Sequence, residues 1–543
     1  MMAVAGSPAG TSGMFGNRGG NDGQWGFGGD PGRVAPTHAP VESSGESAPR
    51  SLAQVDSERT FRYRHGDADD RVEPGEAYDP PNDNRPNDAR HAPLSTFSID
   101  VDTASYANVR RFLNAGETPP RDAVRIEELI NYFPYHYAPP HDSRPFSVHV
   151  EIASCPWSSG HRLARIGLKG KDLARGRRPA ANLVFLIDVS GSMADANKLP
   201  LVKRGLGLLI DGLEDDDHVA IVTYAGSSGV ALPPTSGANK ERIRRALDGL
   251  SAGGSTNGAS GVDLAYATAD EDFVKGGVNR VILATDGDWN VGITDRSQLV
   301  DLIKRKATGG VFLSVLGFGM RNLKDATMEQ LADNGNGSYA YIDSLEEAHK
   351  VLVEQMNGTL VTIAKDVKLQ VEFNPAKVAS YRLIGYENRM LARRDFTDDR
   401  KDAGEIGAGH TVTALYEIVP ADGAAADVTP RRYAPAADQV PADGSTDEML
   451  AVNVRYKLPD ADRSTWFVVP ARDTGTSLAR ASEDFRFAAA VAGFGLVLRQ
   501  APYRGSASLA EVYEQARGAL GDDAPGYRHE FIELVRRAMR MDR

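Results

Sequence analysis

The sequence of 543 residues contains a single cysteine, Cys155. One thiol excludes an intrachain disulfide framework and any zinc site built from several cysteines. Cys155 lies between Ser154 and Pro156 and has no CxxC partner. It is therefore predicted to be a small buried hydrophobic residue and not a nucleophile.

The sequence also has no excess of positive charge. It contains 62 lysines and arginines and 74 aspartates and glutamates, so the net charge is −12. Proteins that bind the phosphate backbone of a nucleic acid usually carry excess positive charge. Nucleic acid is therefore not an expected partner.

Long apolar runs are absent as well. The longest, from Ala488 to Leu498, is about half of the roughly 20 residues that a helix needs to span a bilayer, so it predicts a buried helix and no transmembrane segment. Met1 to Gly10 has neither the basic nor the apolar part of a secretory signal. The compartment is left open by these residues, and membrane association would require a signal upstream of this start.

The length of the chain exceeds what one hydrophobic core usually serves, so we expect more than one folded unit. Residues 1–92 are rich in Gly, Pro, Ser, Asp and Asn and lack apolar periodicity, which is typical of a disordered leader. Residues 93–145 predict a small α+β accessory domain, with alternation around Ile99 and a helical pattern from Thr103 to Leu113.

Asp100 and Asp102 precede that helix and allow two interpretations. The pair faintly resembles the acid pair of haloacid-dehalogenase-type phosphatases, but Ser98 interrupts the apolar strand that such a site requires. The favoured interpretation is a helix N-cap, in which Asp102 or Thr103 accepts hydrogen bonds from free backbone amides.

Apolar runs alternate with amphipathic stretches through residues 181–358. Continuous runs of this kind are typical of parallel strands buried on both faces of a sheet. The runs are Leu183 to Ile187, Val219 to Tyr224, Arg280 to Thr285 and Val311 to Phe318. The expected helices are Leu199 to Leu213, Lys240 to Leu250, Gly258 to Phe273, Ser297 to Ala307 and Met328 to Asn334. The pattern predicts a doubly wound, mostly parallel α/β sheet, whose ligands bind at the carboxyl ends of its strands.

Period-two alternation marks both flanks of this α/β domain. Residues 146–180 contain two candidate strands, and residues 359–543 contain further strands followed by terminal helices. We expect the two sets of strands to pair in one accessory β-rich domain that the α/β domain interrupts.

Asp188, Ser190 and Ser192 occupy alternate positions where the first apolar run ends and a helix is about to begin. One carboxylate and two hydroxyls in a tight loop are hard oxygen donors, which suit Mg²⁺ or Mn²⁺. Thr256 lies just before the helix that begins near Gly258, and Asp286 follows the run that ends at Thr285. Because all three loops join strand ends or helix starts, we expect them to meet at one edge of the sheet. Asp288 would orient a bound water or, as we prefer, cap the following loop.

Asp188, Ser190, Ser192, Thr256 and Asp286 resemble the metal-ion-dependent adhesion site of von Willebrand factor type A domains. The resemblance implies a Mg²⁺ ion held by the first four residues, with Asp286 acting through water, and an open position that a partner's carboxylate fills. The flanks resemble a bacterial subfamily of the YfbK-like type, whose members often carry a lipoprotein signal that this sequence does not show. That resemblance rests on the segments Ser95 to Tyr106, Glu127 to Phe133, Cys155 to Trp157 and Arg162 to Lys171.

Metal-dependent binding of a protein partner, rather than catalysis, is therefore the expected function. Two alternatives stay open: a metal-dependent hydrolase, and a structural scaffold whose site is vestigial. No Walker loop, HExxH or GxSxG motif supports the hydrolase.

Overall fold

The computed structural model describes residues 76, 78, 80, 82–173, 178–255, 258–287, 296–320, 324–355, 360–401, 403–421 and 447–542. Within these ranges no helix has both the length and the apolar character needed to cross a bilayer.

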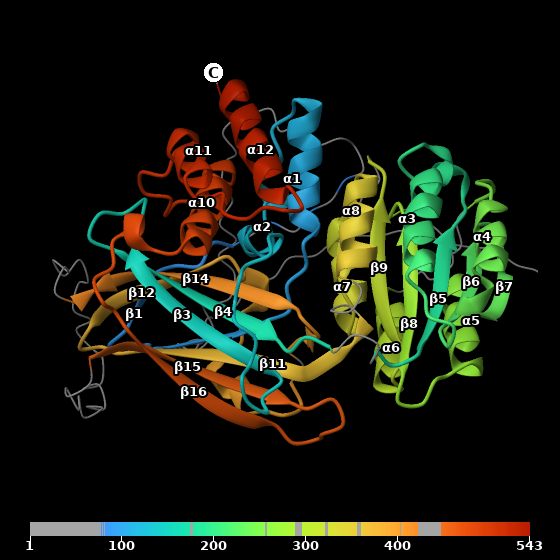
Figure 1. Ribbon diagram of the computed structural model, residues 1–543, viewed down its shortest axis with the longest axis horizontal. Coiled ribbons are helices and arrows are strands. Elements are labelled where there is room, and N and C mark those ends of the chain that lie inside the picture. Colours follow the sequence, from blue (N-terminus) through green and yellow to red (C-terminus); the bar gives the residue numbers. More distant parts are fainter. Residues whose placement is uncertain are drawn as a thin grey trace, which may run out of the picture. The chain divides into compact units, whose positions relative to one another are not determined.

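The α/β part is a mixed sheet built on the predicted apolar runs (Figure 1). Its strands lie in the order β10-β9-β8-β5-β6-β7, and every neighbouring pair is parallel except β6 with β7. The strands are β5 (Ala181–Asp188), β6 (His218–Tyr224), β7 (Ser228–Ser236), β8 (Val278–Thr285), β9 (Phe312–Phe318) and β10 (Tyr339–Ile342). The predicted doubly wound, mostly parallel sheet is confirmed.

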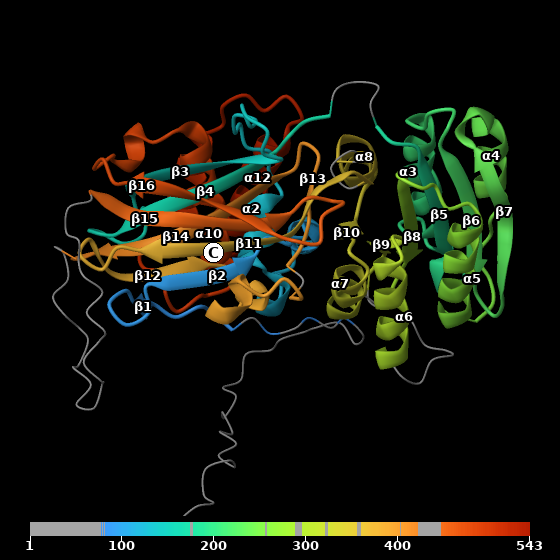
Figure 2. The same ribbon diagram turned by 90° about the horizontal axis from the view of Figure 1, so that it is seen from below.

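Helices cover both faces of this sheet, because each buried strand presents apolar side chains to both sides. Helices α3, α4 and α8 pack on the face of Phe185 and Ile187, whereas α5, α6 and α7 pack on the face of Val184 and Leu186. Figure 2 shows the two layers on opposite sides of the strands. The helices are α3 (Leu199–Asp211), α4 (Lys240–Asp248), α5 (Gly258–Glu271), α6 (Arg296–Thr308), α7 (Asp325–Asn334) and α8 (Leu345–His349), which continues as the π-helical turn η4 (Lys350–Glu354).

The flanks form two further sheets that enclose a second apolar core. One has the order β1-β12-β14-β4-β3, and the other has the order β13-β11-β15-β16 with β2 also paired to β11. Strand β4, which precedes the α/β part, pairs with β14, which follows it. The strands are β1 (Asn87–Asp88), β2 (Leu94–Ser98), β3 (Phe146–Ser154), β4 (Arg162–Gly170), β11 (Thr362–Phe373), β12 (Val378–Ile384), β13 (Ile406–Gly407), β14 (Thr411–Pro420), β15 (Glu448–Lys457) and β16 (Thr465–Arg472).

A helical layer covers the outer face of the first of these sheets (Figure 1). It consists of α2 (Ile126–Asn131), α10 (Glu483–Leu498), α11 (Leu509–Arg517) and α12 (Tyr527–Met541), while α1 (Ala104–Ala115) contacts α2 and α12. The apolar run at the end of α10 is a buried helix, as predicted. Cys155 is buried in the same layer, as predicted, and burial raises the pKa of its thiol to about 12.

Part of the predicted disordered leader, residues 82–92, is folded. Strand β1 pairs antiparallel with β12, and the side chain of Asn84 donates a hydrogen bond of 2.7 Å to the carbonyl of Gly385. Residues 82–92 therefore belong to the folded unit, and their ordering comes from backbone pairing, which their polar composition does not reveal. Residues 1–75 lie outside the described part of the chain.

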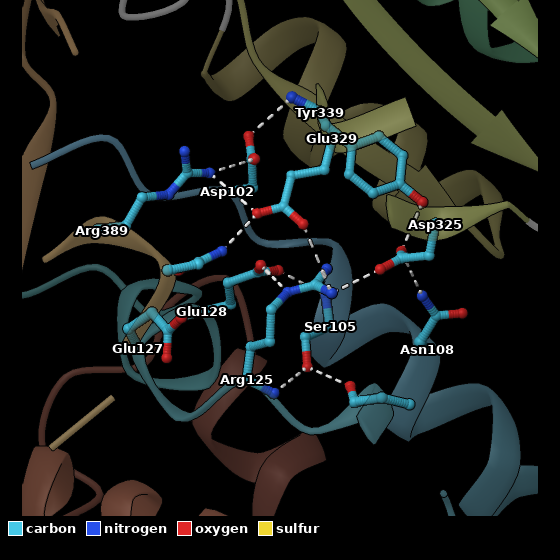
Figure 3. Close-up of polar contacts among 12 residues, drawn as sticks. Asp102, Ser105, Asn108, Arg125, Glu127, Glu128, Asp325, Glu329, Tyr339 and Arg389 are labelled. Atoms are coloured by element: carbon cyan, nitrogen blue, oxygen red, sulfur yellow. Dashed lines mark hydrogen bonds and ion pairs between the residues drawn. The ribbon is translucent and has the colours of Figure 1, made fainter. Parts of the chain in front are cut away.

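A buried polar cluster joins the α/β part to the flanks (Figure 3). Arg389 binds Glu329 of α7, and Arg125 binds Asp325 of the same helix. The predicted N-cap of α1 is wrong, because Thr103 occupies the cap position without a side-chain hydrogen bond. The Asp102 carboxylate instead accepts a hydrogen bond of 2.7 Å from the backbone amide of Tyr339, and it lies 3.4 Å from the Arg389 guanidinium.

Candidate functional site

The first candidate loop begins where β5 ends. Strand β5 is buried along its whole length, so its last residue, Asp188, has no exposed surface. Beyond it the chain turns at once, because the backbone amide of Ser190 donates a 2.9 Å hydrogen bond to the Asp188 carboxylate. The 3₁₀ turn η2 (Gly191–Ala194) follows.

The two serine hydroxyls lie together on this turn. Ser190 Oγ is 3.0 Å from Ser192 Oγ, which is the proximity that alternate positions of a tight loop predict. Ser190 is buried and Ser192 is half-buried. The loop therefore brings a carboxylate and two hydroxyls to one end of β5, next to β6 and β8.

The second loop is tied to the first by backbone hydrogen bonds. Gly253 N donates to the carbonyl of Val189 at 2.8 Å, and Gly191 N donates to the carbonyl of Gly254 at 3.0 Å. These bonds fix the chain up to Ser255 beside the first loop. Thr256 follows Ser255 directly but lies outside the described residues, as does Asp288.

The third loop places Asp286 directly after β8, with one per cent of its surface exposed. Its neighbour Thr285 contacts the first loop, since Thr285 Oγ1 lies 3.4 Å from a carboxylate oxygen of Asp188. Three of the predicted residues, Asp188, Ser190 and Ser192, thus lie in contact, and Asp286 lies close enough to act on the charge of Asp188.

Lys198 is a site residue that the sequence analysis missed. Its ammonium donates a 2.9 Å hydrogen bond to the Asp286 carboxylate and a 3.0 Å hydrogen bond to the carbonyl of Ser192. It thereby connects the first loop to the third. Gly319, which has a φ of +78°, leaves space for this lysine, because a Cβ there would lie 2.4 Å from Lys198 Cε. The sequence carries no spacing signal for Lys198, since the loop after Ser192 folds back to bring it there.

The two carboxylates of the site are buried and repel one another. Burial raises the pKa of the Asp188 carboxyl to about 6; hydrogen bonds from Ser190 oppose this shift, and the negative charge of Asp286 adds to it. Burial and the charge of Asp188 also raise the pKa of the Tyr224 hydroxyl, which faces the same carboxylate. A cation at this place would relieve the repulsion.

The donor set fits a hard cation. Carboxylate and hydroxyl oxygens are the ligands that Mg²⁺ and Mn²⁺ prefer, and a site that uses few carboxylates keeps several coordination positions for water or a partner. Across the described ranges no group of three or more His, Cys, Asp or Glu side chains is arranged to hold a metal ion. A cation here would thus depend on the hydroxyls as much as on the carboxylates.

Family models match three segments of the chain. Residues 182–355 match the von Willebrand factor type A domain, residues 73–165 match a model described as von Willebrand factor, and residues 358–541 match the C-terminal region of the uncharacterized protein YfbK. The three segments correspond to the α/β part and its two flanks.

Individual proteins match over different lengths. The uncharacterized protein YfbK of Escherichia coli is 46% identical over 470 residues, which cover 85% of this chain and 81% of that protein. The human inter-alpha-trypsin inhibitor heavy chain H4 is 31% identical over 163 residues, which cover 28% of this chain and 17% of that protein. Among solved structures, a von Willebrand factor type A protein from Catenulispora acidiphila covers 72% of this chain and 89% of its own, with 14% identity and a TM-score of 0.40.

Proposed function

Because this chain belongs to the YfbK family and contains a von Willebrand factor type A domain, we propose that it is a metal-dependent protein-binding module. Asp188, Ser190 and Ser192 hold a Mg²⁺ or Mn²⁺ ion, with Thr256 and Asp286 completing the set. The observation that carries the proposal is the convergence of the Asp188 carboxylate and the two serine hydroxyls on one buried turn beside Asp286.

The bound cation supplies a Lewis-acidic position for a carboxylate of the partner protein. The chain's own residues prepare that position. The amide of Ser190 orients the Asp188 carboxylate, and the bonds between the loops of Val189 and Gly253 hold the serine turn in place. Lys198 fixes the Asp286 carboxylate, so that its oxygens do not rotate away from the site.

The rim of the site supports a protein partner. Met320 follows Gly319, the residue against which Lys198 packs, and 43% of its surface is exposed. In a protein contact at this place, the side chain of Met320 would add apolar surface next to the polar group that gives specificity.

The hydrolase alternative receives no such support. Hydrolysis requires a general base near the cation. The amine at this site, Lys198, donates hydrogen bonds to the Asp286 carboxylate at 2.9 Å and to the carbonyl of Ser192 at 3.0 Å, so it holds the two loops together and does not face an open position for a substrate.

Calorimetric titration of Mg²⁺ and of Mn²⁺ into the EDTA-treated full chain tests the metal site. Wild type is expected to bind, and Asp188→Ala is expected to bind about 100-fold more weakly or not at all. Asp195→Ala is the matched control, because Asp195 is an exposed carboxylate just after the same turn and its loss should change the affinity by less than about two-fold. Absence of binding by wild type, or equal binding by Asp188→Ala, refutes the metal site.

Capture of partners from a lysate with Mg²⁺, compared with EDTA, tests the role of the cation in binding. We expect the wild-type protein to capture partners that elute with EDTA, and we expect Asp188→Ala not to retain them. A vestigial scaffold predicts that capture is the same for both proteins. A hydrolase predicts turnover of model phosphate esters that Asp188→Ala abolishes.

A further inference from the structure

A cavity of about 480 Å³ lies where the α/β part meets the flanks. Its wall includes Arg280 of β8 and Lys350 of η4 from the α/β part, and Lys169, His410 and Tyr527 from the flanks. A volume of this size is within the range of small-molecule sites. The cavity is separate from the candidate metal site, since Arg280 lies near the start of β8 and Asp286 follows its end.

Arg280 carries a buried charge with little compensation. Only 2% of the residue is exposed, and its guanidinium donates a 2.6 Å hydrogen bond to the neutral hydroxyl of Ser314. The buried Nε of Arg280 has no hydrogen-bond partner among the described residues. Burial lowers the pKa of the guanidinium to about 10, and the negative charge of Glu405 opposes this shift. Arginine is almost never fully buried unless it is paired, so the unsatisfied Nε and the buried charge would both be stabilised by a bound anion.

Lys350 adds a second buried cation to the same wall. It is 2% exposed, and its ammonium donates a 2.5 Å hydrogen bond to the carbonyl of Tyr132. The rings of Tyr132 and Tyr527 flank the ammonium, but no carboxylate in the described ranges forms an ion pair with it. Burial lowers the pKa of Lys350 to about 7.

The two cations belong to the same side of the α/β sheet. Alternate residues of β8 face alternate sides, and Ile282 and Ala284 face the layer that contains α8 and η4. Arg280 has the same parity as these two residues. Its side chain therefore points to the side on which Lys350 lies.

Most acidic side chains of the wall have other partners. The charges of Glu347 and Glu354 nevertheless favour the Lys350 ammonium, and the charge of Glu405 favours the Arg280 guanidinium. Glu405 also has contacts of its own. The pairs are Asp100 and Asp102 with Arg389, Asp172 with Lys169, and Glu354 with the hydroxyl of Tyr527.

We propose that this cavity binds a small anion bearing a carboxylate or phosphate group, with Arg280 and Lys350 as its cationic anchors. The guanidinium offers a planar set of donors that suits either group, and the ammonium offers a point charge. This site is additional to the proposed metal site and does not depend on it.

Binding of inorganic phosphate and of succinate to the full chain tests the site and distinguishes its two ligand chemistries. Both are titrated at pH 6.5, at constant ionic strength and in EDTA, with calorimetry and thermal denaturation as readouts. We expect saturable binding of at least one anion and a raised melting temperature. Arg280→Gln should weaken that binding by about ten-fold or more, because it removes the charge and most of the donors.

Arg394→Gln is the matched control, since 92% of that side chain is exposed, and it should leave the affinity unchanged. Asp188→Ala should also bind the anion as wild type does, which separates this site from the metal site. If Arg280→Gln fails to fold, as judged by circular dichroism, Lys350→Gln provides the same test. The proposal is overturned if wild type binds neither anion saturably, or if the folded cavity variants bind with wild-type affinity.

Discussion

Replacing Arg389 by methionine should weaken the junction between α7 and the flanks. The guanidinium makes two hydrogen bonds to Asp333, of 2.6 and 3.2 Å, and one of 3.1 Å to Glu329. It also lies 3.3 Å from Asp100 and 3.4 Å from Asp102. Removal of one partner from a buried ion pair typically costs about 3–5 kcal/mol, because the remaining charges stay buried without compensation. We expect a loss of that size at pH 8.

The loss should shrink as the pH falls. Burial raises the pKa of Glu329 to about 7 and that of Asp333 to about 6. A raised carboxyl pKa means that the folded state holds protons that the unfolded state has released, so these groups favour folding at low pH and lose that contribution as the pH rises through 6 to 7. At pH 5 both carboxyls are protonated in the variant. The expected cost there is that of lost hydrogen bonds, about 1–3 kcal/mol.

Urea denaturation of wild type and Arg389→Met at pH 5 and pH 8, followed by hydrogen exchange at α7, measures this difference. Arg394→Met is the control, because its exposed side chain should contribute less than about 0.5 kcal/mol at either pH. A cost below about 1 kcal/mol at pH 8, or the same cost at both pH values, would show that the four carboxylates do not depend on Arg389.

Three further outcomes follow from the packing. Cys155 should resist a thiol reagent at pH 8 in the native protein and react after unfolding, since burial raises the pKa of its thiol to about 12; rapid native labelling would contradict its burial. Gly337→Ala should lower the melting temperature strongly, because its Cβ would lie 1.8 Å from the carbonyl oxygen of Leu313. Gly207→Ala in α3 meets nothing within 4 Å and should stabilise the helix by about 0.5–1 kcal/mol. Equal effects of the two substitutions would refute this steric argument. The free-energy changes of Asp188→Ala and Arg280→Gln should add to within about 0.5 kcal/mol in the double variant, and a larger deviation would reveal coupling between their sites.

The central strands could be predicted from sequence because burial on both faces leaves a continuous apolar run, as in β5 and β8. The edge strands could not. Strand β7 contains two prolines and exposed positions, which a sheet tolerates only at its edge, and β10 has only four residues. Neither leaves a run long enough to distinguish it from a loop.

In the candidate site, too, some contacts could be predicted from the sequence and others could not. Asp188, Ser190 and Ser192 are neighbours in the sequence, so a tight turn after a buried strand is enough to predict that their oxygens meet. Lys198 and Thr285 reach the same place through tertiary structure, which residue spacing does not report.

Asp102 shows why a plausible local interpretation can fail. An acid before a helix is a good N-cap candidate, but the backbone amide of Tyr339 and the guanidinium of Arg389 both contact its carboxylate. Both partners are more than 200 residues away in the chain. The residues around α1 in the sequence do not reveal these two partners. The orientation of the Asp102 carboxylate is therefore set by tertiary contacts.

Strand β8 connects the two proposed sites. Thr285 at its end contacts Asp188, and Arg280 near its start lines the cavity. The five residue steps from Arg280 to Thr285 span about 17 Å, which is beyond direct contact but within one strand. The intervening residues are buried and paired with β5 and β9, so both neighbouring strands oppose bending of β8. A cation at one end and an anion at the other would therefore sense each other only through a displacement of the whole strand, and that is why independent energetics are the expected result.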